Sequence, residues 1–211
     1  MPVVLIANPK GGVGKSTLAT NIAGYFASRG HAVMLGDVDR QQSSGLWLNL
    51  RPAKAAPIAT WEAAGEGTVA RPPRGTTHAV LDTPAGLHGW RFKEVVALAD
   101  QILVPLQPSI FDIYATRDFL LRLESQRRVD KSRIGLVGMR VGAHTLSGDR
   151  LREFVARLGV PMVAELRDTQ NYVQLAARGL TLFDIAPGRV QRDLEQWQPL
   201  VHWLDQQVGS R

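Results

Sequence analysis

Short apolar runs alternate with longer segments of helical periodicity along most of this chain. Runs with the character of strands lie at residues 3–7, 32–35, 79–81, 102–106, 134–141 and 160–163. A continuous apolar run is typical of a strand that is covered on both faces of a sheet. Strands that alternate with helices predict an α/β fold with a mostly parallel, twisted sheet and helices on both faces.

Helical spacing of apolar residues fills most of the gaps between these strands. The expected helices are residues 16–28, 92–99, 113–127, 148–158, 172–177 and 190–208. Gly30 is expected to end the first helix, because glycine tolerates the left-handed backbone found at helix C-termini. Residues 51–77 are rich in Ala, Pro, Gly and Thr, and they predict a loop-rich excursion with room for one short helix.

The overall composition narrows the class of protein. The 211 residues are 45% hydrophobic and suit a single domain, residues 1–211. The absence of cysteine excludes disulfides, thiolate metal sites and cysteine nucleophiles. No apolar run approaches the roughly 20 residues of a membrane-spanning helix, and the short apolar start indicates a first strand rather than a signal peptide. We therefore expect a cytoplasmic protein, and its net charge of +6 favours phosphate-bearing partners.

A glycine-rich segment between the first strand and the first helix carries the strongest chemical signal. Glycines let backbone N–H groups point inward at phosphate oxygens, and the N-terminus of the following helix adds a positive dipole end. Lys15 is placed to reach the β- and γ-phosphates, and the Ser16 hydroxyl is placed to bind Mg²⁺. The expected nucleotide-binding residues of this loop are Lys10, Gly11, Gly12, Val13, Gly14, Lys15, Ser16 and Thr17.

This loop departs from the ordinary phosphate-loop pattern G-x-x-x-x-G-K-[ST]. Pro9 stands where the first glycine falls, and a second lysine, Lys10, stands five residues before Lys15. The resulting K-G-G-V-G-K-S-T segment resembles the deviant Walker A loop of ParA/MinD-family ATPases. The resemblance implies ATP and Mg²⁺ as cofactors, ATP hydrolysis, and a Lys10 that reaches across a homodimer to the partner's phosphates. A second cation on the triphosphate stabilises charge during transfer, so nucleotide state would control assembly.

Aspartates close the second and third expected strands. Asp37 and Asp39 follow the second strand, and Asp82 follows the third. Carboxylates at the C-terminal ends of parallel strands face the ligand crevice, where they can orient water or hold Mg²⁺. By the same resemblance, Asp39 matches the catalytic, water-activating position, Asp37 supports the metal, and Asp82 opens switch II and contacts the metal through water. Arg40 stands where the family usually has proline.

Weaker matches to the family lie further along the chain. Residues 105–112 resemble the proline-rich loop of short, ParF-type partition ATPases, the branch that the chain resembles most. Met139 and Arg140 end a strand where the family often contacts adenine, and Pro187 would form another wall of that pocket. The resemblance is specific only over roughly the first 110 residues.

The charge distribution and the resemblance together predict the partners. The expected function is DNA partition by an ATPase that dimerises on ATP and then binds DNA non-specifically, which would place it on the nucleoid. A ParB-like or other partner protein would stimulate hydrolysis. No helix-turn-helix precedes the first strand, so operator binding is not expected. Arginines gather in the second half of the chain, interleaved with acids, at Arg117, Arg122, Arg127, Arg128, Arg150, Arg152, Arg157, Arg167, Arg178, Arg189 and Arg192.

Two other functional classes compete with this interpretation. A MinD-like positioning ATPase would act at a membrane or on a non-DNA cargo. The polar face of the last helix carries Asp193, Glu195 and Asp205 with few cations, whereas a membrane-surface helix prefers Lys and Arg. Its apolar stripe is therefore expected to pack on the protein's own core. Metabolic ligases that share the fold lack a counterpart of Lys10, and the nitrogenase iron protein needs cysteines.

Overall fold

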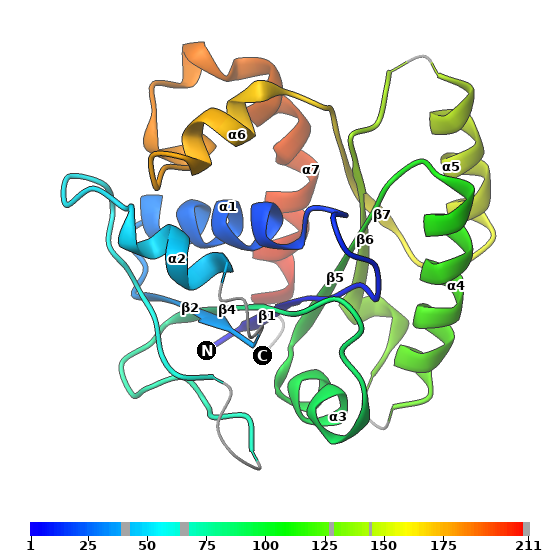
Figure 1. Cartoon of the computed structure of the whole chain (residues 1–211), viewed down its shortest axis with the longest axis horizontal. Helices are drawn as coiled ribbons and strands as arrows, with labels where there is room; N and C mark the ends of the chain where they lie inside the picture. Colours follow the sequence, from blue (N-terminus) through cyan, green and yellow to red (C-terminus); the bar gives the residue numbers. More distant parts are fainter. Residues whose placement is uncertain (39–42, 64–67, 127–128, 144, 209–211) are drawn as a thin grey trace.

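One parallel sheet forms the centre of the molecule (Figure 1). The computed structural model describes residues 1–38, 43–63, 68–126, 129–143 and 145–208. Within them, seven strands pair in the order β3-β2-β4-β1-β5-β6-β7, and every pair is parallel. The strands are β1 Val3–Ile6, β2 Val33–Asp37, β3 Ile58–Ala59, β4 His78–Asp82, β5 Gln101–Leu106, β6 Ile134–Met139 and β7 Met162–Leu166. The predicted α/β class is confirmed.

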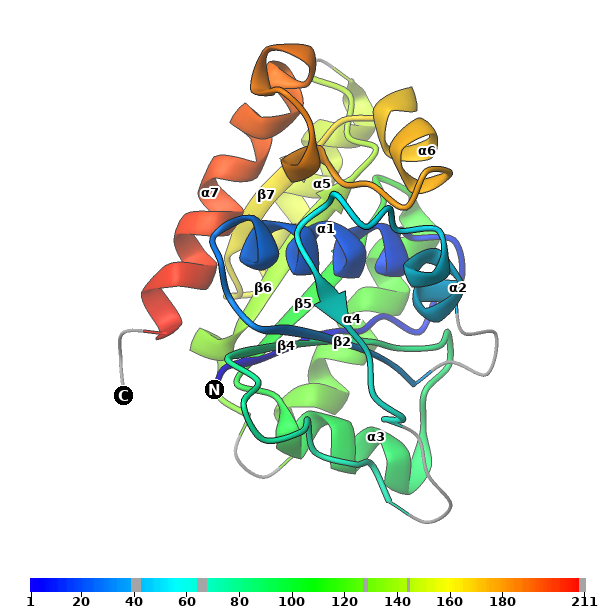
Figure 2. The ribbon, with the colours of Figure 1, turned by 90° about the vertical axis from the view of Figure 1, so that its left-hand side faces the viewer.

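Helices cover both faces of this sheet. On one face lie α1 Lys15–Ser28, α2 Ser43–Asn49, α6 Gln170–Ala176 and α7 Gln191–Val208. On the other lie α3 Gly89–Leu98, α4 Ile110–Glu124 and α5 Leu146–Ala156. Figure 2 shows the sheet edge-on, with α1 above it and α3 below. Three 3-10 turns complete the described elements, namely η1 Lys131–Arg133, η2 Leu182–Asp184 and η3 Pro187–Arg189.

The central strand shows why its sequence is apolar throughout. Val4 and Ile6 of β1 point into the core beneath α1 and α7, whereas Val3 and Leu5 point into the core beneath α3 and α4. Each of the four side chains is at most 4% exposed. Because alternate residues of a strand point to opposite faces, a strand between two helical layers is buried at every position.

Several predicted boundaries are wrong, and the reasons are physical. The sixth expected strand, residues 160–163, starts only at Met162, because Val160 packs in the core without joining the sheet. Helices α3, α4 and α5 begin two or three residues before their first expected position. Their first turns carry few core-facing residues, so apolar periodicity did not mark them.

The excursion at residues 51–77 also differs in part from its prediction. Its described residues hold the short edge strand β3 and no helix. The short helix of this region is α2, which lies just before the excursion and buries Trp47. A two-residue strand is too short to show any hydrophobic period.

The last helix lies against the core, as its apolar stripe predicted. The indole of Trp197 is 1% exposed, Leu200 and Leu204 are fully buried, and Val201 is 9% exposed. The helix packs along β7. Among the described residues, no helix combines the length and the apolarity that crossing a membrane would require.

A buried histidine gives the fold a testable response to acid. His78 lies at the start of β4, and its ring is tilted against two others. The centroid of its ring is 4.4 Å from that of Phe26 and 3.9 Å from that of His31. Burial lowers the pKa of His78 from 6.5 to about 4, and the charge of His31 adds to this effect. Between pH 6.5 and 4, His78 is therefore protonated in the unfolded chain and neutral in the folded chain. Because the unfolded chain binds more protons, the free energy of unfolding falls as the pH falls from 6.5 towards 4.

We expect His78→Phe to remove this acid sensitivity. Between pH 7.5 and 4.5, the unfolding free energy of the wild-type protein should fall by about 2 kcal/mol more than that of the variant, once solvent screening is considered. Urea unfolding at several pH values measures this difference. His31, Asp205 and the amino terminus also act on His78 and stay unchanged in the variant. Parallel pH profiles for the two proteins would contradict the assignment.

Candidate nucleotide-binding site

The glycine-rich segment forms a tight loop between the end of β1 and the start of α1. Gly12 and Gly14 have φ angles of 73° and 95°, which L-residues with side chains rarely adopt. Any Cβ at position 14 would also lie 2.7 Å from the Met139 Cε. Gly14 is the N-cap of α1, so the free N–H groups of the helix start open into the loop, as anion binding requires.

Two amides fasten this loop to the neighbouring strand and its connection. The buried Asn8 donates from Nδ2 to the Pro105 carbonyl at 2.8 Å, and its Oδ1 accepts from the Lys10 N–H at 2.8 Å. Gln107 Nε2 donates to the Gly12 carbonyl at 3.0 Å. Asn8 was not among the predicted site residues. The signal that could have found it is a polar residue directly after a fully buried strand, where its hydrogen bonds must be satisfied internally.

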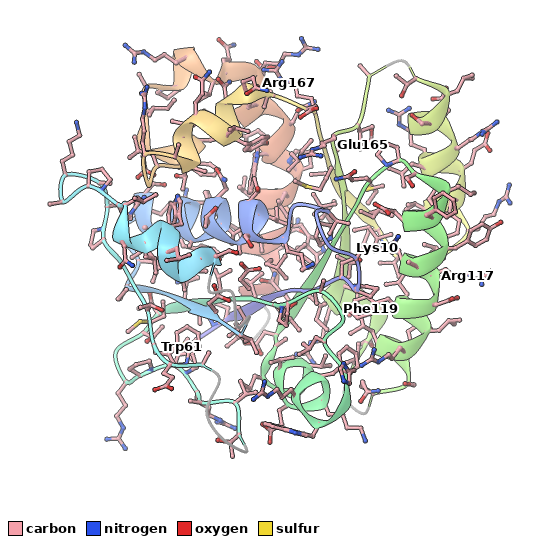
Figure 3. All side chains as sticks on the ribbon, in the orientation of Figure 1. Lys10, Trp61, Arg117, Phe119, Glu165 and Arg167 are labelled. Atoms are coloured by element: carbon pink, nitrogen blue, oxygen red, sulfur yellow. The ribbon has the colours of Figure 1, made fainter. Side chains whose placement is uncertain are left out.

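The two lysines of the loop have different surroundings. Lys15 is buried, at 8% exposure, and its ammonium donates to the Lys10 carbonyl at 2.7 Å, so it folds back over its own loop. The Lys10 side chain is 41% exposed, and its ammonium lies 3.9 Å from Asp112 Oδ1 in the first turn of α4. Figure 3 shows Lys10 between the loop and α4. Only Lys15 is therefore committed to the interior of its own loop.

Two of the predicted acids meet at the C-terminal edge of the sheet. Asp37 of β2 and Asp82 of β4 are direct register partners in adjacent parallel strands. The Ser44 hydroxyl donates to Asp82 Oδ2 at 2.5 Å, and the Ser44 N–H donates to Asp37 Oδ2 at 2.9 Å. Ser44 is the first-turn residue of α2 that the sequence analysis missed.

Burial is the main influence on the Asp82 carboxyl. It raises the pKa of Asp82 from 3.8 to about 6, against the lowering effects of the hydrogen bond from Ser44 and of the nearby Ser16 hydroxyl. The charge of Asp37 raises this pKa further, and the charge of Lys15 lowers it. Asp82 Oδ1 is buried and has no hydrogen-bond partner within the described part of the chain.

This donor set suits a magnesium ion bound together with phosphates. Mg²⁺ prefers oxygen ligands and usually takes one or two carboxylates, a hydroxyl, waters and substrate phosphates. Ser16, Asp37 and Asp82 supply such oxygens, and the unpartnered Asp82 Oδ1 is a group that a cation or its water would satisfy. The described residues contain no cluster of three or more acids or histidines able to hold a metal unaided. The residues therefore fit Mg²⁺ as a companion of nucleotide.

The structure does not bring the remaining predicted site residues together into one described site. Asp39 lies outside the described residues. Met139 is buried against Gly14 of the loop, whereas Arg140 is exposed, has a φ of 56° and lies 3.8 Å from Asp168. Pro187 opens the exposed turn η3. The adenine pocket predicted from Met139, Arg140 and Pro187 thus stays a prediction.

A glycine loop at a helix start, with a buried lysine and acids at neighbouring strand ends, defines a P-loop nucleotide-binding protein. The model of the CobQ/CobB/MinD/ParA nucleotide binding domain matches residues 4–182 of the chain. The chain belongs to this family, and it is a ParA/MinD-family ATPase. The predicted family and enzyme class are therefore confirmed.

Individual relatives represent several branches of the family. The chain is 27% identical over 197 residues to maintenance of carboxysome distribution protein A from Halothiobacillus neapolitanus, covering 89% of this chain and 90% of that protein. Its fold is similar, with a TM-score of 0.74 and 13% identity, to a putative plasmid partition protein from Borrelia burgdorferi bound to AMPPNP, over 97% of this chain and 98% of that one. It is also similar to MinD from Pyrococcus horikoshii complexed with Mg-ADP, with a TM-score of 0.63 and 15% identity, over 85% and 86% of the chains.

Proposed function

We propose that this protein is an ATP-dependent dimerising ATPase of DNA partition, which binds DNA non-specifically in its ATP state. The observation that carries the proposal is the separation of the two lysines. Lys15 folds over its own loop, whereas Lys10 is half-exposed and extends towards α4. A cation that is not committed to its own loop is available to the phosphates of a second subunit, which would make bound ATP part of a dimer interface.

We assign different roles at the nucleotide site to different residues of the chain. The loop N–H groups and Lys15 would bind the phosphates, Ser16, Asp37 and Asp82 would hold Mg²⁺, and Asp39 would orient the attacking water. When bound, Mg²⁺ supplies positive charge that stabilises the phosphates during transfer. Burial of Lys15 and Asp82 keeps bulk water from screening these charges.

The adenine base extends this site towards the ends of β6 and η3. Met139, Arg140 and Pro187 are the residues that we assign to it. Met139 supports the assignment, because its buried thioether already packs against the phosphate loop. An apolar side chain beside a phosphate loop suits a purine ring.

Arginines that already pair with an acid or a carbonyl group of the protein are poor candidates for contact with DNA. Arg152 pairs with Glu165, and Arg167 pairs with the fully buried Asp193. Arg117 pairs with Asp118, and Arg122 donates to the Leu87 carbonyl. Within the described residues, the arginines that are exposed and have no acid within 4 Å include Arg150, Arg157, Arg178, Arg189 and Arg192.

The last three of these arginines form the more strongly positive group. Arg178 follows α6, Arg189 ends η3, and Arg192 lies in the first turn of α7. Two acids of this region, Asp184 and Asp193, are already neutralised by Arg51 and Arg167, and the exposed Glu195 of α7 stands one turn from Arg192. Arg150 in α5 and Arg157 at its C-cap stand beside two exposed acids of that helix, Asp149 and Glu153. We therefore assign DNA contact to Arg178, Arg189 and Arg192.

We expect the triple variant Arg178→Ala, Arg189→Ala, Arg192→Ala to lose most ATP-dependent DNA binding. Each lost phosphate contact should reduce the slope of log affinity against log salt by about 1. Fluorescence anisotropy with a DNA duplex, in ATP and in ADP and at several salt concentrations, measures both effects. The double variant Arg150→Ala, Arg157→Ala is the matched control and should retain binding. Equal losses in the two variants would contradict the assigned surface.

A second candidate is a positioning ATPase for a large protein cargo. It is favoured by the match to a protein that maintains carboxysome distribution, which spans most of both chains. Both candidates require a partner protein, ParB-like or otherwise, that stimulates hydrolysis. A membrane-attached version receives less support, because the stripe of α7 is already buried in the core. Absence of DNA binding at low salt, together with intact ATP-dependent dimerisation, would replace the DNA proposal with a cargo-bound mechanism.

A further inference from the structure

The start of α2 lies against the two aspartates of the metal site, and one serine contacts both. The hydroxyl of Ser44 donates to Asp82 Oδ2 at 2.5 Å, and its backbone N–H donates to Asp37 Oδ2 at 2.9 Å. Ser44 is completely buried, and Asp82 is 1% exposed. A single buried residue thus connects the acids of two neighbouring strands.

The two oxygens of Asp82 have opposite surroundings. Oδ2 accepts the Ser44 hydroxyl, whereas Oδ1 is buried without a hydrogen-bond partner among the described residues. A buried polar atom without a hydrogen-bond partner destabilises a fold, and proteins rarely tolerate one without a reason. Since Ser44 fixes the carboxylate through one oxygen, the other oxygen is left for a ligand.

We propose that Ser44 is a positioning residue for the Mg²⁺ of the nucleotide site. Its hydroxyl orients the Asp82 carboxylate so that Oδ1 remains for the cation or its water, and its N–H holds Asp37 beside it. The proposal rests on the Mg²⁺–nucleotide site described above. Partners that orient metal-binding carboxylates typically contribute a factor of about 10–100 to metal affinity.

The surroundings of α2 separate this role from simple helix anchoring. Trp47 is buried in the core one turn further on, so the helix keeps its main packing contact without the Ser44 hydroxyl. The adjacent Ser43 is exposed and belongs to the same helix turn. Ser43→Ala is therefore a control with the same chemical change and no contact with either acid.

The experiment measures ADP affinity as a function of Mg²⁺ concentration, using a fluorescent ADP analogue and the full chain. ADP is chosen because it avoids hydrolysis. In Ser44→Ala, the Mg²⁺ concentration that gives half of the affinity gain should rise by about 10–100-fold. Affinity in the absence of Mg²⁺ should stay within roughly twofold of wild type, which corresponds to less than about 0.5 kcal/mol. Ser43→Ala and the hydroxyl-retaining Ser44→Thr should behave as wild type.

Two results would overturn the proposal. One is an unchanged Mg²⁺ dependence in Ser44→Ala, and the other is an equal loss of ADP affinity with and without Mg²⁺, which would show a purely structural role. Thermal unfolding without nucleotide checks that the variant folds. If it does not fold, Ser44→Cys replaces it, because a thiol is a weak donor of similar size and should shift the Mg²⁺ requirement in the same direction.

Two further outcomes connect the inference to the proposed function. Combining Ser44→Ala with Asp82→Asn should give no greater loss of Mg²⁺ dependence than Asp82→Asn alone, since the serine acts through that carboxylate. A wild-type protein that bound no ADP would overturn the nucleotide site and this inference together. Normal Mg²⁺-dependent binding that Ser44→Ala leaves unchanged would overturn the inference alone.

Discussion

Lys15→Ala is expected to weaken the binding of ATP and ADP at least about 100-fold. In the structure the Lys15 ammonium is buried and folds over the loop, where it donates to the Lys10 carbonyl at 2.7 Å. A buried cation facing phosphates is worth several kcal/mol, because little water screens the attraction. A loss of 2.7 kcal/mol or more corresponds to about two orders of magnitude in the dissociation constant.

Isothermal titration with ADP and with a non-hydrolysable ATP analogue measures this loss. Lys93→Ala, a change at an exposed lysine of α3, is the matched control and should leave both affinities unchanged. Thermal unfolding of the nucleotide-free protein shows whether Lys15→Ala still folds. If folded Lys15→Ala binds nucleotide within a few-fold of wild type, Lys15 does not meet the phosphates and the site assignment is wrong.

The parts of this site that follow a local pattern could be predicted from the sequence. The phosphate loop could be predicted because its backbone needs glycine at Gly12 and Gly14 and because a strand and a helix flank it. Asp37 and Asp82 were each expected to face the ligand crevice, since the C-terminal ends of parallel strands share one edge of the sheet, and the structure pairs them in register. Patterns of this kind lie within a few residues and need no knowledge of packing.

The parts that depend on long-range contacts could not be predicted. Ser44 lies 38 residues from Asp82 along the chain and sits in a short helix without a clear apolar period. Asn8 is held by a carbonyl and a hydroxyl that come from the region of β5 and α4. No local pattern distinguishes a serine or an asparagine that closes such a contact from one in an ordinary turn.

The arginines show the same limit for charge. From the sequence alone, all arginines in the second half of the chain look equally available, although acids in the fold neutralise some of them. Arg167 is tied to Asp193, which is 26 residues away and fully buried. Arg152 is tied to Glu165 of the neighbouring strand β7. Only the structure therefore separates exposed cations without a nearby acid from cations that hold the protein together.

The second large effect is expected from Lys10→Ala, which should abolish ATP-dependent dimerisation and leave nucleotide binding by the single subunit largely intact. The Lys10 side chain is 41% exposed and does not fold over its own loop. If it meets phosphates of the partner subunit, its removal leaves charge at both copies of the interface without a counterpart. Loss of one such charge contact costs about 2–5 kcal/mol, or roughly 30- to several-thousand-fold in the dimer dissociation constant.

Sedimentation velocity with ATP and Mg²⁺ measures this effect, with Asp39→Ala in both proteins to slow hydrolysis. Asp112→Asn is the decisive control, because it removes the ion pair of Lys10 within the protomer and leaves the lysine charge in place. If Lys10 acts across the interface, Asp112→Asn should dimerise at least as well as wild type. If Lys10 only anchors α4 to the loop, both variants should lose the dimer equally. If Lys10→Ala dimerises at the same protein concentrations as the wild-type protein, Lys10 does not contribute to the dimer interface.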